Sequence, residues 1–184
     1  MAHLVEITPA AYASVAHIAR RMREADALEI YPHLFRQTPE DLAMHSSRSA
    51  KAYTALSDGE PVAAWGAGEQ FPKVWQCWMF ATDRWPEVAS TVTKFIRREF
   101  SQELINSDAV RLHCWSADDH HVAHRWLEVL GFIREATLED FSQDRQTFHC
   151  YSITRSRLEK KNYVYIQSAD TPAGSAGGSI REAR

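Results

Sequence analysis

The segment Ala117-Asp-Asp-His-His-Val-Ala-His-Arg-Trp-Leu-Glu-Val-Leu-Gly-Phe132 indicates the fold of this chain most clearly. Its apolar residues recur at steps of three and four and so fill one face of a helix; they are Val122, Ala123, Trp126, Leu127 and Leu130. Gly131 follows them at the position where many helices end in a left-handed residue. The segment therefore predicts an amphipathic helix that ends at glycine and leads directly into a strand.

Strands are predicted on both sides of this helix. Ala109 to Trp115 is an apolar run of strand length before it, and Phe132 to Leu138 and Gln146 to Thr154 form a strand pair after it. Ser116, followed three residues later by Asp119, resembles a capping box in which Asp replaces Glu. The C-terminal half is thus predicted to run strand, helix, strand, strand.

The N-terminal part predicts a strand followed by a long helix. His3 to Ile7 alternates in strand fashion, and Thr8-Pro9 offers an N-cap followed by proline at the first helical position. A stripe of apolar residues with helical spacing then runs to about Tyr31, where Pro32 discourages continuation. We therefore expect a single helix from Thr8 to Tyr31.

A β-hairpin is predicted in the middle of the chain. Asp58-Gly59 separates two strand-like runs, 51–57 and 61–68, and this dipeptide favours a two-residue hairpin turn. The remaining expected elements are a short helix capped by Thr38, a strand over Val74 to Ala81, and a helix after Thr82-Asp83. The predicted order is β-α-α-β-β-β-α-β-α-β-β.

The composition is that of one ordinary globular domain. The chain has 184 residues, of which 45% are hydrophobic and 24% are charged, so it can bury one core. A formal net charge of -3 gives no electrostatic case for a nucleic-acid or membrane partner. The sequence shows neither a signal peptide nor a membrane span, which favours a cytoplasmic protein. Its three cysteines are expected to be buried, reduced thiols.

Residues 161–184 differ from the rest of the chain in composition and in their lack of an apolar pattern. Ser168 to Gly178 is rich in Ala, Gly, Ser, Thr and Pro without apolar periodicity, which predicts a flexible tail. Within the tail, Tyr163 to Ile166 could add an edge strand. We therefore expect a domain over residues 1–160 and a C-terminal tail over 161–184.

The predicted order of elements, with Trp126-Leu-Glu-Val-Leu-Gly-Phe132 between the last helix and the next strand, resembles the GNAT acyltransferase superfamily over roughly residues 3 to 155. Met22 to Glu29 and Arg125 to Phe132 also look like GNAT-like proteins encoded by short-tailed phages, which are often named acetyltransferases or internal virion or morphogenesis proteins. The resemblance implies a single α/β domain. Its sheet would be mixed, mostly antiparallel and six- or seven-stranded, with helices on both faces.

The resemblance also implies acetyl-CoA as cofactor. In GNAT enzymes a glycine-rich turn after the equivalent of Val74 to Ala81 holds the pyrophosphate with backbone N–H groups. The corresponding residues 81–88 contain no glycine, Pro86 removes one donor, and Asp83 adds a negative charge, although Thr82 and Arg84 could partly compensate. The cofactor-binding residues implied by the resemblance are Phe80, Ala81, Thr82, Arg84, Trp85 and His124.

The catalytic residues implied by the resemblance differ in part from those usual in the superfamily. The superfamily's asparagine position holds His120, and the position of its proton-donating tyrosine holds Leu127, which cannot donate a proton. A proton donor would have to be His120, His124 or a water. Glu24 and Glu29, near Asp26 on the first helix, border the acceptor side and could take the amine proton. Alternatively, these carboxylates are surface charges or members of structural ion pairs.

Three other groups of residues bear on the function. His120 and His124 lie one helical turn apart and could share a metal, but a solvated or capping role fits their spacing better, and no metal site is predicted. Cys114 faces away from His113 along a strand, which disfavours a cysteine nucleophile. If Trp75 and Trp85 are exposed, they would form a protein-binding patch; otherwise they pack in the core.

Two functions follow from these observations. The first is a phage-encoded, acyl-CoA-dependent N-acyltransferase that transfers an acetyl group to a small amine or a protein, with Glu24 or Glu29 as base and His120 orienting or protonating the thiolate. The second is a catalytically inactive GNAT-like domain that binds and modulates a host bacterial enzyme or takes part in virion assembly. In either case we expect the protein in the host cytoplasm, without nucleic-acid or membrane partners.

Overall fold

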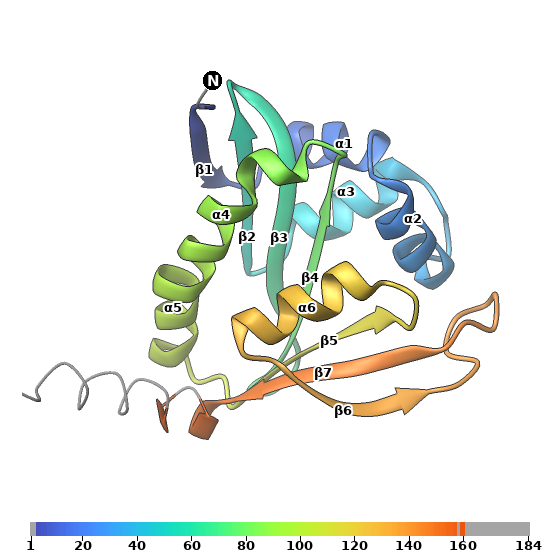
Figure 1. Cartoon of the computed structure of the whole chain (residues 1–184), viewed down its shortest axis with the longest axis vertical. Coiled ribbons are helices and arrows are strands. Elements are labelled where there is room, and N and C mark those ends of the chain that lie inside the picture. Colours follow the sequence, from blue (N-terminus) through green and yellow to red (C-terminus); the bar gives the residue numbers. More distant parts are fainter. Residues whose placement is uncertain (1–2, 158, 161–184) are drawn as a thin grey trace, which may run out of the picture.

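The computed structural model describes residues 3–157 and 159–160, which form an α/β domain built on one mixed sheet (Figure 1). Seven strands pair in the order β1-β2-β3-β4-β5-β7-β6. They are β1 Val5–Pro9, β2 Lys51–Ser57, β3 Glu60–Phe71, β4 Val74–Ala81, β5 Arg111–Ala117, β6 Ile133–Leu138 and β7 Phe148–Thr154. Every neighbouring pair is antiparallel except β4 and β5. The predicted mixed, mostly antiparallel sheet is therefore confirmed.

Helices cover both faces of this sheet, as predicted (Figure 1). On one face lie α1 Tyr12–Arg20, α2 Glu24–Ile30, the 3-10 turn η1 Tyr31–His33 and α3 Pro39–Ser47. On the other lie α4 Trp85–Phe95, the π turn η2 Ile96–Phe100, α5 Ser101–Asn106 and α6 His121–Leu130. None of the helices in the described ranges has the length and apolar character that crossing a bilayer requires.

The core lies on both faces because successive residues of β4 point in opposite directions. Trp75 and Ala81 pack into the cluster that includes Val88 and Val92 of α4. Phe80 points to the opposite face of the sheet, where it is fully buried against α1 and α3. A strand that is apolar on both sides is typical of the middle of a covered sheet.

The strands β4 and β5 separate after a short parallel contact. They pair only at Val74 with Arg111, Trp75 with Leu112 and Gln76 with His113. Beyond that point β4 runs on to Ala81, while β5 runs on to Ala117 paired with β7. The sheet is therefore split into two halves that diverge from a common vertex.

The helix predicted within residues 117–132 is present as α6. Gly131 has φ 97° and ends α6, and the N–H of Phe132 donates to the carbonyl of Leu127. This is the hydrogen-bond pattern of a Schellman motif, in which only glycine takes the left-handed angle without strain. The predicted capping box is wrong, because Ser116 lies inside β5 and the N-cap residue is His120 without a side-chain cap bond.

The prediction of a single helix from Thr8 to Tyr31 is also wrong. Thr8 and Pro9 stay in β1, where they pair with β2, and α1 begins only at Tyr12. The chain leaves the helix after Arg20 because Met22 forms a bridge to Thr82, next to the end of β4. A second helix, α2, then starts at Glu24.

Other local predictions are confirmed. Asp58 and Gly59 both have positive φ, 52° and 80°, as a type I′ hairpin turn requires. Thr38 accepts a hydrogen bond from the N–H of Asp41 and so caps α3. The proposed edge strand at 163–166 lies outside the described residues.

We predict that Gly66→Ala destabilises the protein and Gly68→Ala does not, although both glycines lie in β3. A Cβ at Gly66 would lie 2.4 Å from the carbonyl oxygen of Lys51 and 2.7 Å from the ring of Trp78, whereas one at Gly68 meets nothing within 4 Å. Overpacking of this kind costs about 1–3 kcal/mol. Urea unfolding of both variants measures the difference, and equal unfolding free energies would contradict it.

Candidate functional site

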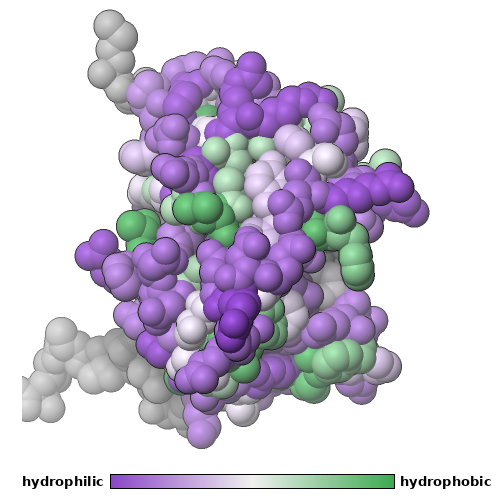
Figure 2. All heavy atoms as spheres, turned by 90° about the vertical axis from the view of Figure 1, so that its right-hand side faces the viewer, coloured by the Kyte–Doolittle hydropathy of each residue, from purple (hydrophilic) through white to green (hydrophobic). Residues whose placement is uncertain are grey.

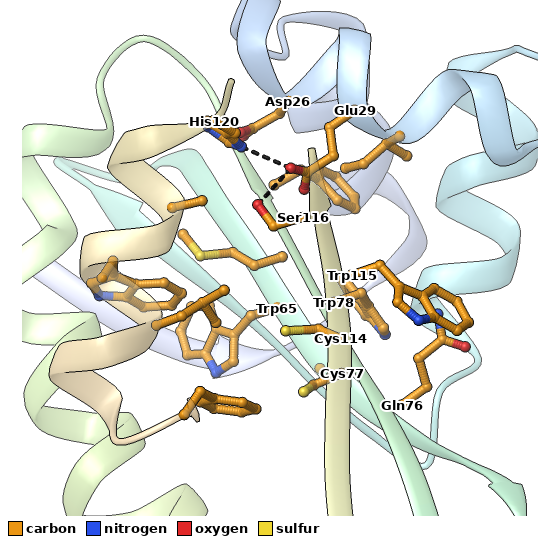
Figure 3. Close-up of a pocket in the computed structure, with 18 of the residues that line it drawn as sticks. Asp26, Glu29, Trp65, Gln76, Cys77, Trp78, Cys114, Trp115, Ser116 and His120 are labelled. Carbon is orange, nitrogen blue, oxygen red and sulfur yellow. Dashed lines mark hydrogen bonds and ion pairs between the residues drawn. The ribbon is translucent and has the colours of Figure 1, made fainter. Parts of the chain in front are cut away.

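A cavity of about 590 Å³ occupies the gap between β4 and β5 (Figure 3). It reaches both faces of the sheet, since its lining comes from the helices of each. On the α4–α6 face the lining includes Met79, Trp85, Trp126, Leu127 and Leu130. On the α1–α3 face it includes Ile30, Leu34, Trp78, Trp115 and Phe148. The cavity is thus an apolar passage through the sheet.

Two carboxylates of α2 span the open end of this gap. Asp26 and Glu29 are three residues apart, so they lie on the same side of the helix. Asp26 Oδ2 accepts the N–H of Ala81, the last residue of β4, at 2.8 Å. Glu29 Oε2 accepts the N–H of Ala117, the last residue of β5, also at 2.8 Å. The helix therefore links the ends of the two diverging strands.

His120 contacts both carboxylates, and Figure 3 shows the three side chains together at one end of the cavity. Its Nδ1 is 3.0 Å from Glu29 Oε2, and its Nε2 is 3.5 Å from Asp26 Oδ1. The hydroxyl of Ser116 donates to the same Glu29 oxygen at 2.8 Å. Three donors from β5 and the residue before α6 thus converge on Glu29, which fixes its orientation.

Burial and charge shift the proton affinities of this cluster. Burial raises the pKa of Asp26, although its hydrogen bond to Arg23 acts in the opposite direction. Burial alone would lower the pKa of His120, but the hydrogen bond to Glu29 and the charges of Glu29 and Asp26 outweigh it, so the pKa is raised. Both groups therefore hold a proton more tightly in the folded protein.

Arg23 provides a cation at the same end of the cavity. Its Nε donates to Asp26 Oδ2 at 2.8 Å, and its guanidinium lies 5.8 Å above the ring of Trp85. Trp85 in turn meets Trp126 edge to face at 5.5 Å. Arg23 is thus held by one carboxylate and one aromatic face, both part of the cavity wall.

The turn between β4 and α4 uses its own backbone donors. The N–H of Thr82 donates to Val62, that of Trp85 to Thr82, and that of Glu87 to Arg84. Pro86 has no N–H to offer. A diphosphate held by backbone amides requires free donors at a helix start. The turn therefore does not fit that mode of phosphate binding.

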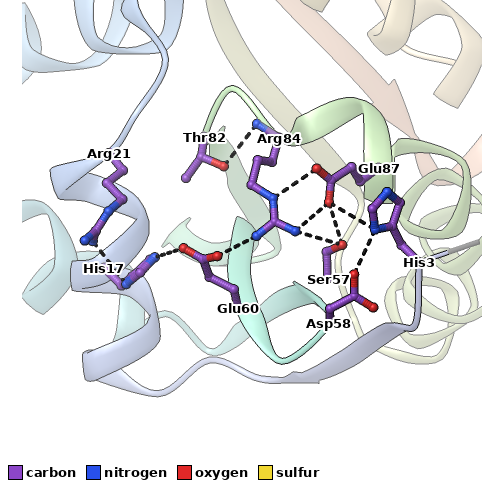
Figure 4. A network of polar contacts seen from close by, with 9 residues as sticks. All are labelled: His3, His17, Arg21, Ser57, Asp58, Glu60, Thr82, Arg84 and Glu87. Atoms are coloured by element: carbon purple, nitrogen blue, oxygen red, sulfur yellow. Dashed lines mark hydrogen bonds and ion pairs between the residues drawn. The ribbon is translucent and has the colours of Figure 1, made fainter. Parts of the chain in front are cut away.

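The side chain of Arg84 is also engaged (Figure 4). It donates to Glu60 at 2.6 Å and to Glu87 at 2.7 Å, and so joins the β4–α4 turn to the β2–β3 hairpin. The same contact with Arg84, aided by Ser57, lowers the pKa of Glu87 to about 2. Arg84 thus lies among carboxylates at the surface and is absent from the cavity wall.

The residues predicted from sequence fall into two groups. Phe80, Trp85, Glu29 and His120 line the cavity. The others do not: Ala81 and Thr82 are buried in the strand end, Arg84 lies in the surface network, Glu24 is exposed, and His124 bonds to the carbonyl of Ala117 and packs on His149 and Tyr151. The condition for an aromatic docking patch is not met, because Trp75 is only 8% exposed and belongs to the core.

Sequence reasoning missed Arg23 and gave Asp26 no distinct role. The available signal was the three-residue spacing of Asp26 and Glu29, which places two carboxylates on one side of a short helix. The proximity of His120 was not available from the sequence, since 91 residues separate it from Glu29.

No protein-family model and no curated protein matches the sequence. Solved structures do match the fold. The ribosomal-protein-S18-alanine N-acetyltransferase from Escherichia coli aligns with a TM-score of 0.60 and 14% identity over 82% of this chain and 94% of its own. An N-acetyltransferase from Staphylococcus aureus Mu50 gives 0.64 and 12% over 83% and 99%, and a GNAT-family acetyltransferase from Bacillus anthracis gives 0.58 and 12% over 85% and 98%. The fold is that of the GNAT acetyltransferases.

We predict that His120→Gln makes stability less dependent on pH. The pKa of His120 is raised above its ordinary value of 6.5, so its protonation stabilises the fold fully below that pH and the contribution is lost as pH rises through the folded pKa. The loss of unfolding free energy on substitution should therefore be larger at about pH 5.5 than at about pH 8.5. His121→Gln, an exposed neighbour, is the control. A pH-independent difference would contradict the prediction.

Proposed function

We propose that this protein is an acyl-CoA-dependent N-acyltransferase that transfers an acetyl group to an amine. The observation that carries the proposal is the passage through the sheet with Asp26, His120 and Glu29 beside it. Acyl transfer requires two reactants to meet in line with a group that handles protons. Because the cavity is lined from both faces of the sheet, a donor and an acceptor could meet in it from opposite sides.

The residues present fit the acyl-pantetheine arm of the cofactor better than its diphosphate. The apolar wall on the α4–α6 face, with Trp85 retained from the sequence prediction, suits a slender, uncharged chain. Phe80, also predicted from the sequence, lines the cavity from the α1–α3 face. The β4–α4 turn offers no amide cradle, and Arg84 is paired with Glu60 and Glu87, so no residue of this turn is assigned to the phosphates. His124, Thr82 and Arg84 then support the turn and α6 and do not contact the cofactor.

The Glu29–His120 pair is proposed to manage the protons. A bound acyl thioester supplies an activated acyl carbon and a thiolate leaving group. Glu29 Oε2 holds the Nδ1 side of His120, and Nε2, which lies 3.5 Å from Asp26 Oδ1, is assigned the exchange of protons with the cavity. Nε2 takes the proton that the amine loses as the carbon–nitrogen bond forms, and returns a proton to sulfur as the carbon–sulfur bond breaks. Glu24 has no part in this scheme.

We predict that Glu29→Gln lowers kcat/KM for acetyl transfer by roughly 100-fold or more, because positioned acid–base groups contribute factors of that size. Glu24→Gln, an exposed carboxylate on the same helix, should leave the rate unchanged. The assay follows release of the free thiol from acetyl-CoA with a mixture of amines, and circular dichroism checks that both variants fold. Equal rates for the two variants would sink the assignment of Glu29.

A second prediction concerns the phosphate charge. Arg84→Ala should change the affinity for acetyl-CoA less than about twofold, since Arg84 is occupied by Glu60 and Glu87. Calorimetric titration of the unaltered protein and the variant measures both affinities. A loss of about tenfold or more, the size of one charge-assisted contact, would show that the β4–α4 turn holds the diphosphate after all.

The occupied turn also favours a second candidate function. A GNAT-like domain without turnover, in the phage setting that the sequence resemblance implies, would act by binding a host enzyme or a virion component. Its turn would need no free amide donors, as observed at Thr82 and Trp85. The face in Figure 2 is mostly hydrophilic with separate apolar groups, so the enzyme remains the first proposal. Absence of acetyl-CoA binding at millimolar concentration by the folded protein would reverse that order.

A further inference from the structure

The half of the cavity on the α1–α3 face has rigid aromatic walls. The indole of Trp78 stacks on Phe80 with ring centroids 5.5 Å apart, and its Nε1 donates to Ser49 at 2.9 Å. Trp115 packs against Phe141 at 5.1 Å. Ser49 and Phe141 hold the two indoles from outside the cavity, and Figure 3 shows both indoles on the same side of it. Flat, immobile walls favour a flat apolar ligand, because little side-chain entropy is lost on binding.

The charges beside these walls favour a cation. Asp26 and Glu29 are the carboxylates among the described lining residues, and Arg23 is the one permanently charged cation among them. Arg23 pairs with Asp26, whereas the hydrogen bonds of Glu29 with the described residues all end on its Oε2 and leave Oε1 unused. An ammonium group in the cavity would donate to that oxygen and exchange contacts with water for contacts with carboxylate.

We propose that the acceptor is a primary amine carried on a flat apolar group, such as an arylalkylamine. Its nitrogen would lie at the Asp26–Glu29 pair, and its apolar group would lie against Trp78 and Trp115. The proposal rests on the proposed function and names the substrate class of the same site.

Two other classes of amine fit this half of the cavity less well. A polyamine or a lysine-rich peptide brings several cations, yet Asp26 and Glu29 are the carboxylates of the described lining, and polar side chains such as His33, Ser46, Gln70 and Gln76 add no negative charge to it. An unpaired ammonium buried there would lose its hydration without compensation. Specificity would thus come from the absence of further carboxylates as well as from the aromatic walls.

Binding of three probes to the full chain tests this inference. They are 2-phenylethylamine, 2-phenylethanol, which lacks the charge, and spermidine, which lacks the aromatic ring. We expect 2-phenylethylamine to bind about tenfold or more tightly than either of the others, measured by calorimetry and by quenching of tryptophan fluorescence. Equal or tighter binding of spermidine or 2-phenylethanol would overturn the proposal.

Variants locate the site. Trp115→Ala should weaken binding of 2-phenylethylamine about tenfold and Trp115→Phe should largely restore it, because the aromatic face is retained. Phe71→Ala removes an aromatic that is 55% exposed and outside the cavity, and should have no effect. Circular dichroism establishes that each variant is folded. Unchanged binding by folded Trp115→Ala would overturn the assignment.

The two proposals fail in different ways. Selective binding of 2-phenylethylamine without any acetyl transfer to it or to other amines would refute the enzymatic function and leave the amine site standing. Acetyl transfer to spermidine or to peptide lysines, but none to 2-phenylethylamine, would refute the amine class and leave the enzymatic function standing.

Discussion

The structure depends on the hydrogen bonds that the backbone N–H groups make at the ends of two diverging strands. When β4 and β5 part, the amides at their last residues lose the partner that a continuous sheet would supply, and a buried N–H without an acceptor is costly. Asp26 and Glu29 supply those acceptors from one short helix, at Ala81 and Ala117. The gap can therefore exist inside a folded domain because α2 lies across it, and the chain must break its first helix after Arg20 to bring α2 there.

The same two carboxylates give the gap its chemistry. A carboxylate that accepts backbone amides stays oriented, and a second charge nearby raises the proton affinity of the imidazole between them. Structural support and proton handling thus share the same atoms, so a substitution at Asp26 would alter both.

The sequence predicted those parts of the fold that are decided locally. Gly131 ends α6 and Asp58-Gly59 turns the hairpin because backbone angles at these positions depend on the residues themselves. The sequence prediction failed where contacts between distant residues decide the local structure. The apolar stripe through residues 11–28 has helical spacing throughout, yet the bridge from Met22 to Thr82 interrupts the helix. Likewise, the spacing of Ser116 and Asp119 indicated a cap, whereas the Ser116 hydroxyl is taken by Glu29 from another element. The phage relationship stays a prediction.

The short vertex between β4 and β5 has a mechanical consequence. Three parallel residue pairs join β1–β4 to β5–β7, and parallel pairing is the weaker kind per residue. Away from the vertex, the halves are connected by α2 at the open end and by α6, where Trp126 donates to Thr93 of α4. Near the vertex the two halves share one buried cluster, in which Trp75 of β4 packs with Leu112 of β5 and Ile153 of β7. Motion between the halves would therefore change the width of the gap mainly at its open end, where side-chain contacts replace strand pairing.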